Sequence, residues 1–501
     1  MAGNAPFDVA IVGFGPSGAV AAALLGQAGH RVYVCDRATA VYPKPRAIAL
    51  DHEIMRVFQQ LGLADAVAQH TEPFTDSCYH GVDGRLIRRM TMAAPPYPLA
   101  WTPSLVFTQP AVDAEVRAAV ARLPNVQVEL KVELIGLRQG ADIATLELAD
   151  GRRIAARWCI GCDGASSTVR ALAGLALDDL GFDQPWLVVD VLVNAHGLAK
   201  LPSTSMQYCE PARPCTLVIG PKNHRRWEIA LNEGDDPRRA ETPAGTWALL
   251  QRWIGPDDGE LWRQASYRFH ALVAQRWRAG RVFIAGDAAH QQPPFLGQGM
   301  CQGIRDVTNL AWKLDAVLRG AAGDTLLDSY GAERSGHVRE LTTRLKAIGE
   351  VIAERDPTRA AARDERLLAE AGGAVQPTPR QDVLPRLQHG LLAHDDSSAR
   401  GTLFPQPWVL RDGVRVRMDD VLGTGWRLIA RDRAPAIEPA WPHLRVTSLP
   451  ELHEADGVVA AWFERHRCSA TLVRPDHYVF GTATDAAGMA GLITQARAAL
   501  H

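Results

Sequence analysis

The segment Phe7-Asp8-Val9-Ala10-Ile11-Val12-Gly13-Phe14-Gly15-Pro16-Ser17-Gly18 decides the fold of this chain. Its first half is a short apolar run rich in β-branched residues, which predicts a buried parallel strand. Its second half has the spacing Gly-x-Gly-x-x-Gly and leads into an alanine- and leucine-rich run that stops at Gly29. A second apolar run then ends at Asp36. This order of strand, glycine turn, helix, strand and acid predicts a Rossmann-type dinucleotide-binding domain.

Each glycine of the motif has its own expected task. Gly13 permits the tight turn, Gly15 lets the backbone approach a pyrophosphate, and Gly18 lets the helix pack near the strand. The free N–H groups and the positive dipole end of the helix favour phosphate. Asp36 is expected to accept hydrogen bonds from ribose hydroxyls, and the adjacent Arg37 is included among the expected cofactor contacts. The motif alone does not choose between NAD and FAD.

The composition is that of a globular protein with several domains. The chain has 501 residues, of which 47% are hydrophobic and 22% charged, and its formal net charge is −2. No basic stripe suggests a nucleic-acid partner, and no apolar run reaches the ~18 residues that span a membrane. The first six residues lack a signal-peptide pattern, and eight cysteines are too few for a disulfide scaffold. We therefore expect a cytoplasmic protein that binds neither nucleic acid nor membrane.

One cysteine pair, Cys159-Ile160-Gly161-Cys162, has the CxxC spacing. A redox or metal function would need a helix start or a second pair of ligands nearby. The pair instead lies on a predicted strand that leads into Asp163-Gly164, so we expect no redox role. No other stretch has metal-ligand spacing, and we expect no bound metal.

The pattern changes several times along the chain. Residues 126–137 and 143–148 are predicted to be antiparallel strands joined at Gly140, and a long helix is predicted over 326–354. Alternating polar positions between 185 and 231 predict an antiparallel sheet that carries one face of a pocket. Residues 356–406 are rich in Pro, Gly, Asp and Arg with weak periodicity, which is typical of a linker.

These patterns predict an α/β protein of three domains with one linker. Residues 1–180 and 275–355 are expected to form a discontinuous dinucleotide-binding domain, with part of 71–105 in the substrate region. An antiparallel-sheet substrate-binding domain is inserted at 181–274. Residues 356–405 form a linker or wrapping segment, and 406–501 form a small C-terminal α/β domain.

Three distant segments together resemble one family. They are Gly13-x-Gly15-x-x-Gly18, Cys162-Asp163-Gly164-Ala165-x-Ser167-x-Val169-Arg170, and Gly286-Asp287-Ala288-Ala289-His290 with Gly297-Gln298-Gly299. In order and spacing they are similar to the single-component flavoprotein aromatic hydroxylases, the group A monooxygenases. The resemblance spans roughly the first 350 residues and implies bound FAD.

Within that family the chain resembles the branch that hydroxylates 3-(3-hydroxyphenyl)propionate. The stretches that carry this likeness are Tyr42-Pro43-x-Pro45-Arg46-Ala47-Ile48, Phe107-Thr108-Gln109-Pro110, Arg225-Arg226-Trp227-Glu228 and Arg305-Asp306-x-x-Asn309. The tail resembles the thioredoxin-like C-terminal domain of phenol and polyketide hydroxylases. It has no CxxC, so no redox role is expected there.

The resemblance implies further FAD contacts outside the glycine motif. Asp287 would accept from a ribitol hydroxyl, while Gly297 and Gly299 would let the backbone approach the isoalloxazine. A helix cap is the alternative for Asp287, and solvated loop positions are the alternative for Arg46 and Gln109. The implied contacts are Arg46, Gln109, Asp163, Asp287, Gly297, Gly299 and Met300.

The implied reaction is the hydroxylation of a phenolic aromatic acid through a C4a-hydroperoxyflavin. FAD would be reduced by NADH or NADPH, which would visit transiently because no second dinucleotide motif is present, and O2 would supply the oxygen. Alternatives are hydroxylation of another phenol or of an aromatic polyketide, and a flavin-binding protein without hydroxylase activity. The resemblance also allows a homodimer.

A base near the substrate hydroxyl would assist this chemistry. Asp51 and His52 are the candidates, because they follow the arginine loop and Asp51 matches an acid in related phenol hydroxylases. The alternative is a helix N-cap pair ahead of Glu53. The residues expected to line the substrate pocket, with sheet packing as their alternative, are Gln207, Tyr208, Pro294 and Phe295.

Overall fold

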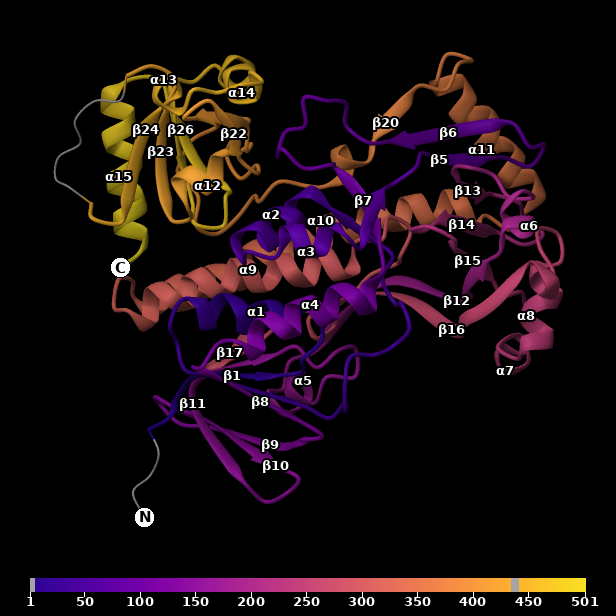
Figure 1. The fold of residues 1–501 in the computed structure, drawn as a ribbon, viewed down its shortest axis with the longest axis horizontal. Helices are drawn as coiled ribbons and strands as arrows, with labels where there is room; N and C mark the ends of the chain where they lie inside the picture. Colours follow the sequence, from indigo (N-terminus) through magenta and orange to yellow (C-terminus); the bar gives the residue numbers. More distant parts are fainter. Residues whose placement is uncertain (1–4, 434–440) are drawn as a thin grey trace.

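The computed structural model describes residues 5–433 and 441–501 (Figure 1). The expectation that no signal peptide is present concerns the first six residues, of which 1–4 lie outside the described part. The chain forms a nucleotide-binding unit, a second unit built on a large sheet, and a C-terminal unit that packs beside the first (Figure 1). Within the described ranges, no helix is long and apolar enough to cross a membrane.

The nucleotide-binding unit is organised around a sheet with the order β17-β18-β11-β1-β2-β8. β1 (Phe7–Val12) pairs in parallel with β2 (Val32–Asp36) and with β11 (Arg153–Gly161). The helices α1 (Pro16–Gln27), α9 (Gly299–Leu318) and α10 (Asp328–Ala353) pack above it (Figure 1). This arrangement confirms the Rossmann-type domain predicted from the glycine motif.

The other elements of this unit are β3 (Ala49–Asp51), α2 (His52–Gln60), α3 (Ala64–Ala68), β4 (Thr71–Pro73), β7 (Ser104–Phe107), α4 (Gln109–Ala121), β8 (Val126–Leu130), β9 (Leu134–Gln139), β10 (Ala144–Leu148), α5 (Thr168–Leu172), β17 (Arg278–Ala279) and β18 (Val282–Ile284). Strand β3 pairs with β7 in a separate small sheet, whose third strand is β4. This small sheet leads the chain from the arginine loop to α2.

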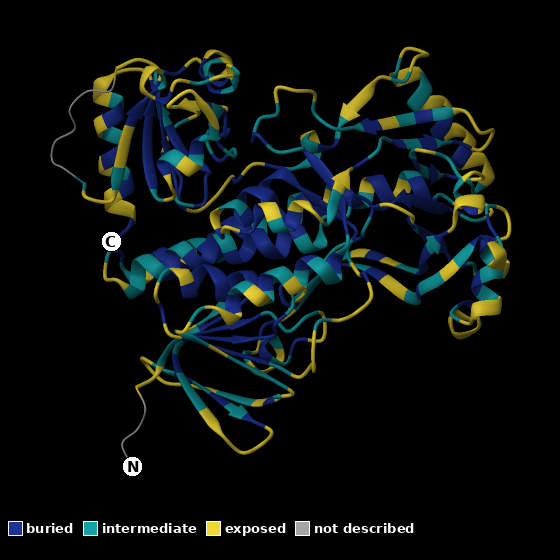
Figure 2. Ribbon diagram, viewed as in Figure 1, coloured by how far each residue is buried: buried dark blue, intermediate teal, exposed yellow. Residues whose placement is uncertain are grey.

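Glycines on α1 and α9 allow α1 to pack closely against the glycine turn and against α9. A Cβ atom added to Gly18 would lie 1.9 Å from the carbonyl oxygen of Gly13, and one added to Gly303 would lie 2.3 Å from Ser17 Oγ. Glycine is therefore required at both positions, which bring α1 against the glycine turn and against α9. The surfaces that meet here belong to the buried centre of the molecule (Figure 2).

The prediction of one continuous strand over residues 126–137 is wrong. The stretch divides into β8, which pairs in parallel with β2, and β9, which pairs antiparallel with β10. Lys131 lies between them with a φ of 61°, a left-handed conformation that interrupts an extended strand. Apolar residues recur on both sides of Lys131, because each strand packs one face against the core. The sequence therefore does not show where the first strand ends.

The second unit is a sheet of nine strands in the order β19-β16-β12-β15-β14-β13-β5-β6-β20. Two long strands, β12 (Leu177–Val193) and β16 (Gly259–Ala274), connect it to the nucleotide-binding unit. Its other elements are β5 (Ser77–His80), β6 (Leu86–Thr91), α6 (Ala195–Leu198), β13 (Ser205–Tyr208), β14 (Cys215–Ile219), β15 (His224–Ala230), α7 (Pro237–Ala240), α8 (Pro243–Leu250), β19 (His290–Gln291) and β20 (Pro377–Pro379).

The segment 356–405 contains more regular structure than its composition suggests. It includes the helix α11 (Pro357–Glu370), the edge strand β20 and a 3-10 turn at Arg380–Val383. The centre of α11 is held by a buried ion pair between Arg363 and Asp364 rather than by a broad apolar stripe. Because those charges are buried, helical periodicity in apolar residues is weak, and the helix was not predicted.

The C-terminal unit contains a sheet with the order β24-β23-β25-β26. Its elements are β21 (Trp408–Arg411), β22 (Val414–Arg417), α12 (Met418–Leu422), β23 (Trp426–Ala430), β24 (Leu444–Ser448), α13 (Leu449–Leu452), α14 (Val458–His466), β25 (Ala470–Val473), β26 (Val479–Ala483) and α15 (Ala486–Ala499). β23 is parallel to β24 and antiparallel to β25. This topology is compatible with the expected thioredoxin-like domain.

Buried charges join the C-terminal unit to the nucleotide-binding unit. The carboxylate of Glu333 on α10 accepts hydrogen bonds from Lys313 Nζ at 2.8 Å, from Arg474 Nη2 at 2.7 Å and from Asn309 Nδ2 at 2.7 Å. Burial alone would raise the pKa of Glu333, but Arg474 and Lys313 outweigh it and lower the pKa to about 2. Glu333 is therefore ionised and satisfied at neutral pH.

Replacing Glu333 by Gln is expected to lower the free energy of unfolding by about 3–5 kcal/mol, because it leaves buried cations without their counter-charge. The free energy is measured by urea titration. The matched control is Glu370→Gln, whose exposed ion pair with Arg366 on α11 contributes at most about 0.5 kcal/mol. Equal small effects of both substitutions would contradict the assigned role of Glu333.

Candidate functional site

A cavity of about 500 Å³ lies between the nucleotide-binding unit and the large sheet. Its nucleotide-side lining includes Gly15, Arg46, Gln109, Gly164, Asp287, Gly297, Gly299 and Met300. Its sheet-side lining includes Val188, Gln207, Thr216, Glu228, Arg263, Tyr267, Pro294, Phe295 and Arg380. A volume of this size suits a small organic ligand or cofactor fragment.

The glycine turn divides its tasks between packing and binding. A Cβ atom on Gly13 would lie 2.3 Å from the carbonyl oxygen of Cys162, so this glycine serves backbone packing, as Gly18 does. Gly15 lines the cavity and has no atom within 4 Å of an added Cβ. It also occupies the N-cap of α1, where free N–H groups meet the open space. The turn therefore offers a cradle for an anionic group.

A second glycine-rich turn lines the same cavity at the start of α9. Gly297 has a φ of 66°, and an added Cβ would meet the Cβ of Ala49 at 2.9 Å. Gly299 begins the helix and faces open space, and Met300 follows it in the cavity wall. The exposed Asp287 lines the same end of the cavity.

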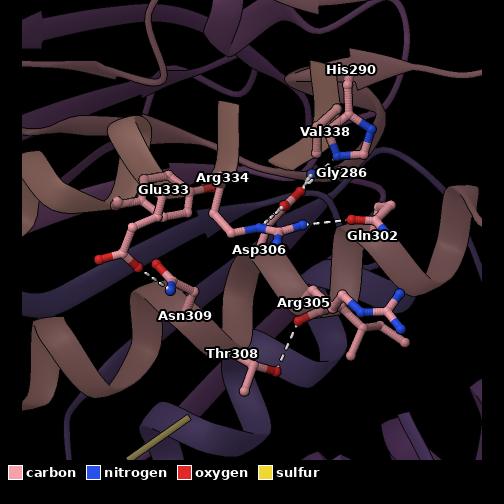
Figure 3. Close-up of polar contacts among 12 residues, drawn as sticks. Gly286, His290, Gln302, Arg305, Asp306, Thr308, Asn309, Glu333, Arg334 and Val338 are labelled. Carbon is pink, nitrogen blue, oxygen red and sulfur yellow. Dashed lines mark hydrogen bonds and ion pairs between the residues drawn. The ribbon is translucent and has the colours of Figure 1, made fainter. Parts of the chain in front are cut away.

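The buried carboxylate of Asp306 on α9 holds this wall in place (Figure 3). Its Oδ2 atom accepts from the backbone N–H of Gly286 at 3.0 Å and lies 2.8 Å from Nε2 of His290. Its Oδ1 atom accepts from Arg334 Nε at 2.9 Å. Burial would raise the pKa of Asp306, but His290 and Arg334 outweigh it and lower the pKa. The ionised carboxylate thus fixes the turn that presents Asp287.

The arginine loop forms a third side of the cavity. Gln109 Oε1 accepts from the backbone N–H groups of Arg46 at 2.8 Å and of Ala47 at 2.6 Å. From the large sheet, Arg226 Nη1 donates to the carbonyl oxygen of Arg46 at 2.8 Å, and Arg263 Nη1 donates to that of Pro45 at 2.9 Å. Both units therefore position the loop.

Besides Gly13 and Gly18, three of the residues predicted to contact the cofactor do not line this cavity. Asp36 accepts from the backbone N–H groups of Phe14 at 2.6 Å and Ala38 at 2.7 Å. Arg37 is exposed next to it. Asp163 accepts from Ser167 Oγ and from the backbone N–H of Val169, which ties the turn before α5. Their roles toward a cofactor stay predictions.

Asp51 and His52, the predicted catalytic pair, lie outside the lining of the large cavity. Asp51 is the N-cap of α2, accepting from the N–H groups of Glu53 and Ile54, and its other oxygen binds Arg305 Nη2 at 2.6 Å. The N-cap alternative is thus confirmed for Asp51. Burial lowers the pKa of His52 to about 4, so its ring is neutral at pH 7. The structure gives no support for a base at either position.

Three of the four predicted substrate residues line the cavity, and Tyr208 does not. Gln207, Pro294 and Phe295 line the cavity. Tyr208 packs on the opposite face, with its ring 5.4 Å from that of Trp253. Adjacent residues on a strand point to opposite faces, so Gln207 and Tyr208 cannot both enter one pocket.

Four charged residues of the cavity lining, Glu228, Arg263, Arg268 and Arg380, were not predicted to lie there. Glu228 belongs to the Arg-Arg-Trp-Glu stretch, where the alternation of charged and apolar residues was a signal that it shares a face with Arg226. Arg380 comes from the segment interpreted as a linker and lies about 300 residues from the strand it touches, so no local pattern indicates it.

The arrangement fits a flavin dinucleotide. Two glycine positions open onto one cavity from the N-termini of α1 and α9, where an added Cβ would occupy ligand space at Gly15 and Gly299. Helix N-termini stabilise the phosphates of a dinucleotide and negative charge on a flavin ring. The fold and the cavity therefore define a Rossmann-type FAD-dependent oxidoreductase with a separate substrate sheet.

Comparison with known proteins identifies the family. The FAD binding domain family matches residues 6–345, and the HcaD C-terminal domain family matches 401–446 and 440–499. The chain belongs to the FAD binding domain family and is an FAD-dependent aromatic ring monooxygenase that takes electrons from NAD(P)H.

Two curated relatives match nearly the whole chain. A probable NADH-specific resorcinol 4-hydroxylase of Rhodococcus jostii (strain RHA1) is 37% identical over 100% of this chain and 96% of its own length. A 3-(3-hydroxy-phenyl)propionate/3-hydroxycinnamic acid hydroxylase of Mycobacterium sp. (strain KMS) is 34% identical over 95% of this chain and 88% of its own length.

Solved structures agree with this family. Aklavinone-11 hydroxylase, crystallised with FAD and aklavinone, has a TM-score of 0.82 at 25% identity and covers 99% of both chains. The flavin-dependent monooxygenase PieE has a TM-score of 0.82 at 23% identity over 100% of both chains, which establishes a shared fold.

Substitutions at two glycines should separate packing from cofactor binding. Gly15→Ala is expected to leave the stability of the FAD-free protein near wild type and to weaken FAD binding at least about tenfold, because the methyl group enters open ligand space. Gly18→Ala should cost about 1–3 kcal/mol of stability through overpacking. Urea titration and FAD titration measure the two effects, and an unchanged FAD affinity in Gly15→Ala would contradict the cradle.

Proposed function

We propose that this monooxygenase hydroxylates a small phenolic acid of the 3-(3-hydroxyphenyl)propionate type with NADH as the electron donor. The observation that carries the substrate class is Arg380, a buried guanidinium in the cavity wall without a carboxylate partner. The relative that acts on 3-(3-hydroxy-phenyl)propionate and the NADH-specific relative support the substrate and the donor, respectively.

Arg380 is 9% exposed and reaches the cavity from the wrapping segment. Its Nη1 donates to Ser77 Oγ at 3.0 Å, its Nη2 donates to the carbonyl oxygen of Leu296 at 3.1 Å, and its guanidinium lies 4.1 Å from the ring of Phe74. No aspartate or glutamate in the described ranges forms an ion pair with it, and burial lowers its pKa. A buried cation that lacks a counter-charge is suited to bind an anionic ligand group.

Two other arginines of the second unit, Arg213 and Arg226, form ion pairs within the protein. Arg213 Nη1 donates to Asp235 at 2.6 Å near the surface. Arg226 donates through Nε to the buried Asp190 at 2.7 Å and is also held by the arginine loop. A substrate carboxylate would have to displace these contacts, and so Arg380 is the better candidate.

FAD, when bound, supplies the transfer of electrons from NADH and the activation of O2. The protein residues bind and orient the reactants. We propose that Gly15 and the α1 N-terminus hold the pyrophosphate, while Asp287, Gly297, Gly299 and Met300 border the flavin with Arg46 and Gln109. Phe295 and the neighbouring aromatic rings of Trp186 and Phe269 exclude water from the substrate end.

Resorcinol is the second candidate substrate. The relative named a probable resorcinol 4-hydroxylase shares 37% identity over the whole chain. Gln207 and Thr216 line the cavity and could hydrogen-bond a second phenolic hydroxyl in the place of a carboxylate. Both candidates need the same flavin chemistry and differ in the group that faces Arg380.

We also place the protein in the cytoplasm. The eight cysteines of the chain are all free thiols, and several are buried. Free cysteines are typical of a reducing compartment.

The direct experiment follows NADH and NADPH oxidation in air with the purified FAD-loaded protein and each phenol, with products identified by mass. The expected result is substrate-stimulated NADH oxidation and a product one oxygen atom heavier from 3-(3-hydroxyphenyl)propionate. A heavier product from resorcinol alone would select the second candidate. Oxidation without an oxygenated product from any phenol tested would refute both.

Replacement of Arg380 by Met tests the carboxylate contact. The KM for 3-(3-hydroxyphenyl)propionate should rise about 10- to 100-fold, which corresponds to the loss of a charge-assisted hydrogen bond worth about 1.5–3 kcal/mol. The KM for resorcinol, which has no carboxylate, should change little. Arg213→Met is the matched control and should leave both values near wild type; equal effects of Arg380→Met on both substrates would argue against the contact.

A further inference from the structure

The substrate side of the cavity is a row of side chains set by strand register. Gln207 on β13 pairs with Thr216 on β14, Thr216 pairs with Glu228 on β15, and Glu228 pairs with Val188 on β12. Directly opposed residues on neighbouring strands point to the same face, with Cβ atoms about 4.5–5.5 Å apart. All four line the cavity, so the carboxylate of Glu228 belongs to a continuous surface facing the substrate space.

The carboxylate of Glu228 is unpartnered among the residues that the structure describes. Its side chain is 6% exposed, and no ion pair or hydrogen bond to its carboxylate exists within the described ranges. Buried carboxylates are normally paired or hydrogen-bonded. Asp190 on the neighbouring strand β12 is an example, because its carboxylate contacts Arg226 and His224. A nearly buried, unpartnered carboxylate that lines a ligand cavity points to a contact with a ligand.

We propose that Glu228 is a catalytic residue that accepts the proton of the substrate phenol. This assignment rests on the proposed function, since it presupposes a phenol in the cavity. It replaces Asp51 and His52, whose positions outside the cavity lining leave the predicted base without a substrate contact.

The remaining cavity groups are less suited to this task. Asp287, the other carboxylate in the described lining, is on the nucleotide side beside the α9 turn. Tyr267 is 39% exposed and its hydroxyl accepts from Arg263, while His270 lies 3.5 Å from Asp183. Arginine does not deprotonate in proteins and cannot act as a base.

Burial and the neighbouring charges determine the pKa of Glu228. Burial raises its pKa to about 7, with Arg226 opposing the rise and Asp190 adding to it. Above that pH the carboxylate is ionised and can accept a proton, and below it the carboxyl group is neutral. The other charged and titratable groups around this space are Arg46, Cys162, His224, Arg263, Tyr267, Arg268, His270, Asp287 and Arg380.

The proton and electron balance is complete with the reactants of the proposed function. As Glu228 takes the hydroxyl proton, the phenolate donates electron density to the ring carbon that bonds one oxygen atom of O2. The other oxygen atom leaves as water, for which NADH, by way of FAD, would supply two electrons and one proton and the solvent the second proton. The oxygenated ring carbon then loses its own proton, and protonated Glu228 returns a proton to the phenolate oxygen to restore the aromatic diol.

A binding experiment tests the contact without turnover. Calorimetry of resorcinol and of 3-(3-hydroxyphenyl)propionate with the FAD-loaded protein, without NADH, gives Kd at pH 6 and pH 8. Wild type should bind the neutral hydroxyl about tenfold more tightly at pH 8, which is the ratio of ionised fractions for a pKa of about 7. Glu228→Gln should show no such difference, and a difference that persists in this variant would overturn the proposal.

Turnover gives the second test. The kcat of Glu228→Gln should fall about 100-fold or more, the range typical of general acid–base groups, and the ionisation near pH 7 should disappear from its profile of kcat/KM against pH. Glu210→Gln is the matched control, because Glu210 pairs with Arg252 outside the cavity, and its profile should match wild type.

The two experiments separate this inference from the proposed function. Phenol binding with the predicted pH dependence but no oxygenated product would uphold the contact and refute the hydroxylase assignment. Product formation with an unchanged pH profile in Glu228→Gln would uphold the hydroxylase assignment and refute the contact of Glu228 with the phenol. If neither phenol binds the wild-type protein at millimolar concentration, both the contact and the substrate class are refuted.

Discussion

The buried carboxylate of Asp306 is the constraint on which the rest of the site depends. It accepts from the backbone of Gly286 and from Arg334, and it contacts His290, so that one charge connects the turn after β18 with α9 and α10. A buried charge is stable only when its hydrogen bonds are complete, which makes this geometry specific rather than adaptable. The position of Asp287 and the start of α9 both follow from it.

The same helix extends this control to the C-terminal unit. One turn from Asp306, Asn309 donates to Glu333 on α10 and to Asp476 of the C-terminal unit. Arg305 donates to Asp51 and to Glu53. Glu53 in turn accepts from the hydroxyl of Tyr478 in the C-terminal unit. The N-terminus of α9 borders the cavity, and its middle carries the interface. The C-terminal unit therefore braces the helix that forms the flavin wall, although it has no CxxC chemistry of its own.

The cavity combines two kinds of surface with different physical tasks. Its nucleotide side presents backbone N–H groups and glycines, which suit phosphate and a flat ring. Its sheet side presents aromatic rings together with Glu228 and Arg380, two buried ionisable groups that form no ion pair within the described ranges. In the proposed function, these two groups would orient a substrate that has a proton to donate at one end and an anion at the other.

The sequence by itself determined the Rossmann-type core, because the glycine motif and its flanking strands are contiguous and Gly18 is required by close contact with the backbone of Gly13. It also indicated the family and the general position of the substrate sheet. Only the tertiary structure decided which side chains face the cavity: strand register puts Glu228 in its lining and Tyr208 on the other face, and Arg380 comes from a distant segment. Asp51 was a catalytic candidate from its place after the arginine loop, and the structure shows it as the N-cap of α2 in contact with Arg305, 254 residues away. Side-chain partners that come from distant segments have no local pattern from which they can be predicted.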